Sequence, residues 1–107
     1  MATVTRQFYY YDTYYYNGNW CEALILCSYA GSYVGRIVFY KDDAAIPPPK
    51  GPPWLSVHYP VSRFNDIVSM LRYERPLYLS ATVTDDVRVG SVQTKHEPVG
   101  EEEEGSP

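Results

Sequence analysis

Residues 7–20 read Gln7-Phe8-Tyr9-Tyr10-Tyr11-Asp12-Thr13-Tyr14-Tyr15-Tyr16-Asn17-Gly18-Asn19-Trp20 and hold six of the twelve tyrosines of the chain. Tyr and Trp combine large, stiff apolar area with one polar handle, which suits both half-buried strands and contact surfaces. The dipeptide Asn17-Gly18 is a strong signal for a two-residue hairpin turn, because both turn positions need φ > 0. The run therefore predicts a β-hairpin with an aromatic face.

The registers of neighbouring strands follow from the positions of the turns. Pairing outward from the first turn places Tyr11 opposite Leu24. A second turn is expected at Gly31-Ser32, since Gly suits the first position of a type II′ turn, and it places Leu24 opposite Phe39. Neither face of the resulting sheet is polar, so both faces need cover. The pattern predicts an antiparallel meander with strands near 4–16, 19–29 and 33–41.

The second half of the chain predicts further strands and one helix. Five prolines within residues 47–53 favour an extended surface loop, because proline cannot donate to a strand ladder. Ser62 is a suitable N-cap for a helix near 63–74, whose apolar stripe at helical spacing consists of Phe64, Ile67, Val68 and Leu71. Further strands are expected near 54–59, 77–83 and 87–93. We therefore expect an α+β fold, with one antiparallel sheet of five or six strands and one helix packed on one face.

Length and charge predict one domain and an acidic tail. The chain of 107 residues is long enough for one modest core, which we assign to residues 1–96. Residues 97–107 carry five of the thirteen acidic residues and are expected to be disordered. Residues 1–96 then hold nine basic against eight acidic residues, which excludes a strongly basic nucleic-acid footprint. The chain lacks an apolar run of about 18 residues and a signal-peptide pattern, so no membrane association and a cytoplasmic location are expected.

Catalytic, metal and redox motifs are missing from the sequence. Cys21 and Cys27 would lie roughly 20 Å apart on one strand, too far for a disulfide, so they are expected to be buried thiols. The acidic pairs Asp42-Asp43 and Asp85-Asp86 fall at expected turns, where Asp is favoured for its own hydrogen bonding. We therefore expect no enzymatic activity, no metal site and no cofactor.

The second face of the predicted meander supports the sharpest functional hypothesis. Aromatic rings and guanidinium groups alternate on it, as in sites for single-stranded nucleic acid, where bases stack on rings for about 1–3 kcal/mol each. Val34 and Val38 also lie on this face, so packing in a homodimer or against the chain's own sheet is the alternative. The predicted nucleic-acid-binding residues are Arg6, Phe8, Tyr10, Tyr14, Tyr29, Arg36 and Tyr40.

The order of elements also carries a resemblance. Four strands followed by a helix, over about residues 4–74, is similar to the Whirly-like fold of single-stranded-DNA-binding transcriptional regulators, in which such units pair as dimers. We expect a homodimeric, non-enzymatic binding or interaction module, with single-stranded nucleic acid as the first candidate ligand. One alternative is a small-molecule binder or enzyme with a pocket between helix and sheet, lined by Trp54, His58 and Tyr59. Another is a purely structural protein–protein interaction module.

Overall fold

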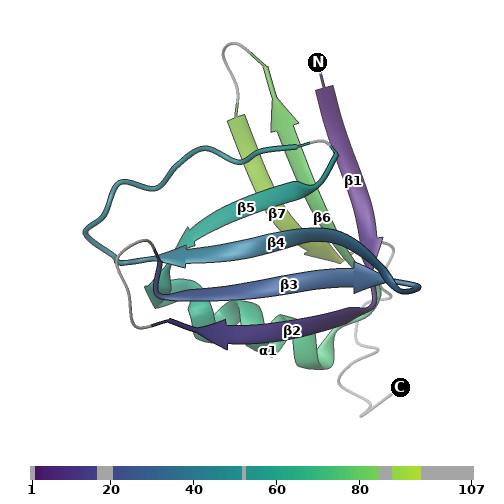
Figure 1. The fold of residues 1–107 in the computed structure, drawn as a ribbon, viewed down its shortest axis with the longest axis horizontal. Helices are drawn as coiled ribbons and strands as arrows, with labels where there is room; N and C mark the ends of the chain where they lie inside the picture. The colour runs from purple at the N-terminus through teal and green to yellow at the C-terminus, as the bar shows by residue number, and fades with distance from the viewer. Residues whose placement is uncertain (1, 17–20, 52, 85–87, 95–107) are drawn as a thin grey trace.

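The computed structural model describes residues 2–16, 21–51, 53–84 and 88–94, which form an α+β fold with two sheets (Figure 1). A three-stranded antiparallel sheet has the order β1-β6-β7, and a four-stranded sheet has the order β2-β3-β4-β5. The strands are β1 (Ala2–Phe8), β2 (Tyr10–Tyr15), β3 (Ala23–Tyr29), β4 (Ser32–Tyr40), β5 (Leu55–Pro60), β6 (Leu77–Val83) and β7 (Arg88–Thr94). The 3-10 turn η1 (Val61–Arg63) leads directly into the helix α1 (Phe64–Tyr73). The α+β class is confirmed, whereas the expectation of one five- or six-stranded sheet was wrong.

The two sheets exist because the predicted first strand divides at Tyr9. Phe8 ends β1 and lies in the core at 1% exposure, while the next residue, Tyr9, is exposed. Residues before Tyr9 pair with β6 and residues after it pair with β3. The strands of the two sheets consequently cross at a steep angle, as Figure 1 shows. A strand that passes from one sheet to the next in this way forms a corner between packed sheets.

The proline-rich connection makes β5 parallel to β4, rather than antiparallel. The register places Gly35 opposite Leu55 and Tyr40 opposite Pro60, so both strands run in the same direction. Parallel neighbours need a crossover connection of about a dozen residues or more, and residues 41–54 supply it. Among the described residues of this connection, only Lys50 forms a β-bridge, an isolated antiparallel one with Ser56 of β5.

The registers of the meander differ from those expected. The β3–β4 turn uses Ala30 and Gly31, with φ of 54° and 83°, which is the pattern of a type I′ turn. Leu24 therefore lies opposite Val38 rather than Phe39, and Tyr11 lies opposite Cys27 rather than Leu24. The predicted turn at Asn17-Gly18 lies outside the described residues, as does Asp85-Asp86. Odd register shifts change which side chains share a face, so the predicted placement of the β3 side chains relative to those of β2 and β4 was wrong.

The main core lies between the two sheets and α1. The helix presents Ile67 and Leu71 to it, which confirms the predicted apolar stripe. The predicted N-cap was wrong: Ser62 lies within η1, and its backbone N–H donates to Asp42 Oδ1 at 2.9 Å. The main cluster comprises Phe8, Ala23, Ile25, Cys27, Ile37, Phe39, Leu55, Val57, Ile67, Leu71, Leu77, Leu79, Ala81 and Val92.

A smaller apolar cluster covers the other face of the four-stranded sheet. Cys21, Leu24 and Val38 are buried there, and Leu26 and Tyr40 pack against them. Both cysteines are free thiols, as expected, and they belong to different clusters. Burial raises the pKa of the Cys27 thiol far above its usual range, which keeps it protonated and unreactive.

Candidate aromatic pocket

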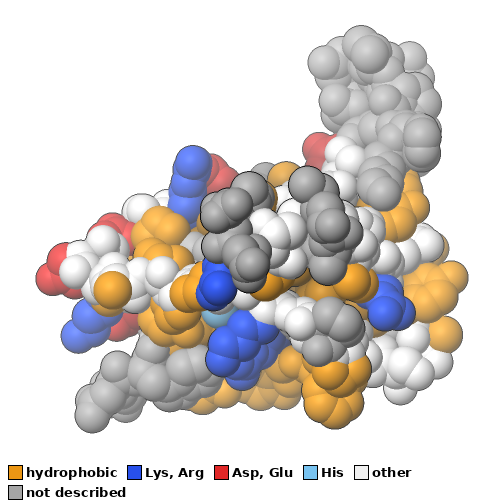
Figure 2. Space-filling view, turned by 90° about the horizontal axis from the view of Figure 1, so that it is seen from above, with side chains coloured by type: hydrophobic (Ala, Val, Ile, Leu, Met, Phe, Trp, Pro, Cys, Tyr) orange, Lys and Arg blue, Asp and Glu red, His pale blue; other side chains and the backbone are white. Residues whose placement is uncertain are grey.

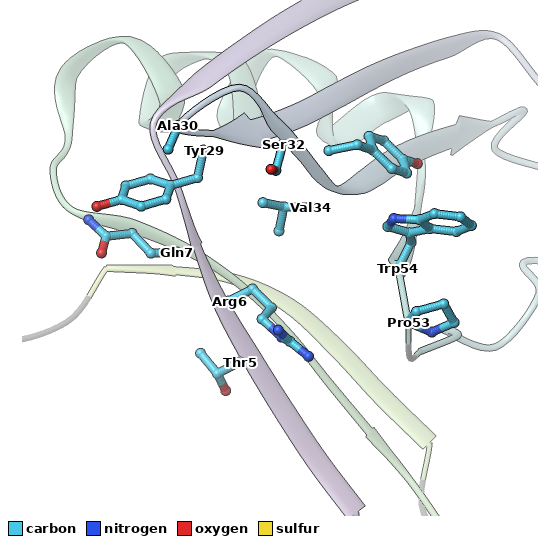
Figure 3. Close-up of a pocket in the computed structure, with 10 residues that line it drawn as sticks. Thr5, Arg6, Gln7, Tyr29, Ala30, Ser32, Val34, Pro53 and Trp54 are labelled. Atoms are coloured by element: carbon cyan, nitrogen blue, oxygen red, sulfur yellow. The ribbon is translucent and has the colours of Figure 1, made fainter.

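An open pocket of about 510 Å³ lies where the two sheets diverge, between β1, the β3–β4 turn and the residues just before β5 (Figure 3). Val34 lines the pocket and also packs against the main core. The lining residues are Thr5, Arg6, Gln7, Tyr29, Ala30, Ser32, Tyr33, Val34, Pro53 and Trp54. The pocket therefore joins segments that are far apart in the sequence.

Arg6 occupies an unusual position in this pocket. Strand alternation places it on the same side of β1 as Val4 and Phe8, which contact the core. Its partner in the ladder is Leu79, which is fully buried. Yet Arg6 itself is exposed, because the sheets separate here, and Figure 3 shows it extending toward the side of Trp54 and Pro53. A charged residue at a core-facing position contradicts the pattern that folding alone would favour.

Aromatic rings form the walls of the pocket. Tyr29, Tyr33 and Trp54 are 45%, 40% and 59% exposed, so each has ring surface available to a ligand. The Tyr33 and Trp54 rings lie 5.8 Å apart between centroids, tilted by 53°. Burial raises the pKa of Tyr33, against the opposing effect of the Arg36 charge, so the phenol is neutral at neutral pH. The pocket thus combines neutral aromatic surface with one guanidinium group.

A second cation continues the aromatic wall beyond the pocket. Tyr29 contacts Tyr9 edge to face, with centroids 6.3 Å apart. The guanidinium carbon of Arg75 lies 5.5 Å from the centroid of the same Tyr9 ring, within cation–π range. Tyr29 and Tyr9 therefore extend the aromatic wall from the pocket to a second cation, Arg75.

A hydrogen-bonded relay holds the pocket wall that carries Trp54. His58 Nδ1 lies 2.9 Å from the carbonyl oxygen of Pro47, which can only accept, so Nδ1 carries the proton. His58 Nε2 then accepts from the Ser56 hydroxyl at 2.7 Å. Arg36 Nε donates to the same Ser56 oxygen at 3.0 Å. Desolvation, together with the charges of Arg36 and Lys50, lowers the pKa of His58 despite the bond to Pro47, so the relay contains a neutral imidazole at neutral pH.

Ser56 and His58 have the spacing of a nucleophile and its base, but their surroundings favour a structural role. Ser56 is only 5% exposed, and Arg36 occupies its oxygen. The backbone groups of Ser56 also exchange two hydrogen bonds with Lys50, at 2.8 and 2.9 Å. Together these bonds fasten residues 47–50 to β5, a few residues before Trp54. The relay therefore positions the loop wall of the pocket.

The structure divides the seven predicted nucleic-acid-binding residues among three places. Arg6 and Tyr29 both line the pocket. Phe8 belongs to the core, so its ring is not available to a ligand in this fold. The strand division at Tyr9 separates Arg6 and Phe8 from the residues of the four-stranded sheet, because it places β1 and β2 in different sheets. The registers place the remaining four on the outer face of the four-stranded sheet: Tyr10, Tyr14, Arg36 and Tyr40.

The three residues predicted to line a helix–sheet pocket also separate. Trp54 lies in the observed pocket, which is not between helix and sheet. Tyr59 faces inward and stacks near Phe39, with centroids 6.3 Å apart. His58 lies on the opposite face of β5, as strand alternation requires. Sequence reasoning missed Tyr33, whose only signal was an aromatic residue beside a turn.

Neither a cluster of three metal-ligating side chains nor a membrane-spanning helix occurs in the part of the chain that the structure describes. No three His, Cys, Asp or Glu side chains gather there as metal ligands. The helix α1 has only ten residues, and the described residues contain no helix with the length and apolar character needed to cross a membrane.

No protein-family model matches the chain, and no curated protein or solved structure matches it either.

Proposed function

We propose that this protein is a non-enzymatic binding module that holds unpaired bases of single-stranded nucleic acid in the aromatic pocket. The observation that carries the proposal is the Arg6 guanidinium, which lies at a core-facing position among exposed rings of Tyr29, Tyr33 and Trp54. Bases stack on such rings whatever their sequence, and a guanidinium group pairs with phosphate oxygens in a bidentate way.

The size of the pocket and the charge of the chain limit the expected affinity. One stacked base contributes about 1–3 kcal/mol, whereas a Kd of 1 mM already requires about 4.1 kcal/mol. One stacked base alone therefore falls short of a Kd of 1 mM, so binding needs further contacts from a second stacked base and a phosphate group. The pocket with Arg6, together with the adjoining Tyr9 and Arg75, supplies rings and cations for these contacts. On the face seen from above in Figure 2, Lys and Arg side chains lie among hydrophobic ones, with acidic side chains away from the centre.

The experiment is a fluorescence anisotropy titration of short labelled single-stranded DNA and RNA with the full-length protein. We expect Trp54→Ala to weaken binding about 5- to 150-fold, which corresponds to the loss of one stacked base. Arg6→Gln should weaken it and reduce its salt dependence, because a phosphate contact is lost. Tyr73→Ala and Arg72→Gln are the matched controls, since both residues are exposed on α1 outside the pocket. Equal losses from the controls would refute the assignment of the site.

A small aromatic anion is the second candidate ligand, and the pocket volume favours it. A volume of about 510 Å³ lies within the roughly 300–1,000 Å³ that is usual for small-molecule sites. The same titration separates the two candidates when a mononucleotide competes with the labelled oligonucleotide. Competition at equal concentration would identify a small-molecule site, whereas oligonucleotides that bind more tightly with each added base support the nucleic-acid proposal.

A further inference from the structure

The strand β2 ends the four-stranded sheet and leaves an edge exposed. Figure 1 shows it as the outermost strand of that sheet, and no strand in the described ranges pairs with its far side. Tyr10 and Tyr15 are 64% and 75% exposed, and Thr13 between them is exposed as well. An exposed edge with unused backbone groups is a template for pairing with another strand.

The backbone pattern shows which residues would make that pairing. Tyr16 N donates to Glu22 O at 3.0 Å, and these residues continue the β2–β3 register. Paired residues alternate between hydrogen-bonded and non-bonded positions in an antiparallel ladder, so Tyr14 and Asp12 also direct their backbone groups toward β3. The residues between them direct N–H and C=O groups toward the free edge: Tyr11, Thr13 and Tyr15.

We propose that β2 pairs antiparallel with β2 of a second copy of this chain, with Thr13 on the two-fold axis, to give one continuous eight-stranded sheet. A two-fold axis perpendicular to the sheet keeps equivalent faces on the same side. With Thr13 on the axis, Tyr11 lies opposite the second copy's Tyr15, so all three outward-directed residues form hydrogen-bonded pairs. The two Thr13 side chains then face each other, which is a favourable cross-strand pair.

The charge of Asp12 selects this register over its neighbours. Placing Asp12 on the axis would set two carboxylates directly opposite each other, which is unfavourable. Placing Tyr14 on the axis would pair only Thr13 and Tyr15 of the three outward-directed residues, because the position opposite Tyr11 would then lie beyond the end of β2 at Tyr15. With Thr13 on the axis, Asp12 instead faces Tyr14, and Tyr10 faces Tyr16, an aromatic pair. The occupant is thus a second copy because the strand is complementary to itself.

The test is the mass of the full-length protein by sedimentation velocity, over concentrations up to about 1 mM. We expect twice the chain mass of 12.3 kDa. Thr13→Asp places like charges opposite each other at the axis and should raise the dimer Kd at least about fivefold. Ser69→Asp adds the same charge on the exposed side of α1 and should leave Kd unchanged. A monomeric wild-type protein over the whole range would overturn the proposal.

Two further variants test the edge and the register separately. Thr13→Pro removes an N–H that points to the free edge and not to β3, so it should give a monomer. Its circular dichroism should match that of the wild type, which shows that β2 still pairs with β3. Asp12→Asn should change Kd by less than about twofold, since Asp12 does not face a second Asp12. A dimer that withstands both Thr13 variants would show that another surface holds it together, and much tighter dimerisation of Asp12→Asn would refute the Thr13-centred register.

Discussion

Replacing Arg6 with leucine should stabilise the protein and weaken oligonucleotide binding in the same step. Arg6 lies on the core-facing side of β1, opposite the buried Leu79, at the mouth of the gap between the sheets. A leucine there would cover apolar surface that the guanidinium now leaves open. Full burial of a leucine side chain contributes about 1.5–3 kcal/mol. Because the position is exposed, a leucine there would be only about half buried, and half of that free energy is roughly 1 kcal/mol.

That free energy is measurable in a domain of this size. It corresponds to a rise in Tm of about 4–8 °C for a domain of up to about 100 residues. Thermal unfolding measures the stability of each variant, and fluorescence anisotropy of a labelled oligonucleotide measures how tightly the same variant binds it. Arg6→Gln provides the control, because it removes the charge without adding apolar surface. A fall in Tm for Arg6→Leu, or full retention of binding, would refute the idea that Arg6 is kept for a ligand at the expense of stability.

Three further outcomes follow from the structure. Folding lowers the pKa of His58, so below about pH 6.5 the folded chain binds fewer protons than the unfolded chain. The stability that His58 contributes should therefore be present at pH 7 and be lost as pH falls through the folded pKa. His58→Gln should flatten that part of the pH profile of unfolding free energy, measured with denaturant. Phe39→Ala should lower the unfolding free energy measured in urea by about 3–5 kcal/mol, because Phe39 is fully buried. Tyr73→Ala on the exposed surface should change it by less than about 0.5 kcal/mol. Similar losses for both variants would contradict the assigned core. Removal of residues 97–107 should strengthen oligonucleotide binding in the anisotropy assay, since it removes five acidic residues, and weaker binding would count against a phosphate contact.

The elements themselves could be predicted from the sequence because each has a strong local signal. The stripe that includes Ile67 and Leu71 is periodic over two turns of α1, and Pro76 follows it. The strands after residue 20 are rich in β-branched and aromatic residues and are separated by turn residues. Local composition is sufficient for predictions of this kind, since neighbours along the chain determine them.

The arrangement of the strands could not be predicted, because it depends on choices that the sequence leaves nearly equal. The division at Tyr9 falls within a run of aromatic residues, and no Gly or Pro marks it. The β3–β4 turn requires φ of 54° at Ala30, a conformation that alanine rarely adopts, so Gly31-Ser32 was the better prediction on local grounds. One residue of error at a turn reverses the faces of the following strand.

The candidate site was predicted only in part for the same reason. Arg6 and Tyr29 were predicted to share one surface and do line one pocket, although this pocket lies between the sheets and not on a flat sheet face. Trp54 joins them because the proline-rich connection returns along β4 to begin β5 beside Gly35. That return depends on bonds made by His58 and Ser56, which no local pattern reveals.

The most direct test of the pocket as a nucleic-acid site is the fluorescence of Trp54 in a Trp20→Phe variant during titration with a short single-stranded oligonucleotide. We expect saturable quenching as bases stack on the Trp54 ring. The apparent Kd should rise about three- to sevenfold between about 50 and about 200 mM salt, which corresponds to one or two phosphate contacts. Oligonucleotide binding without any change in Trp54 fluorescence, or no binding at either salt concentration, would contradict the proposed function.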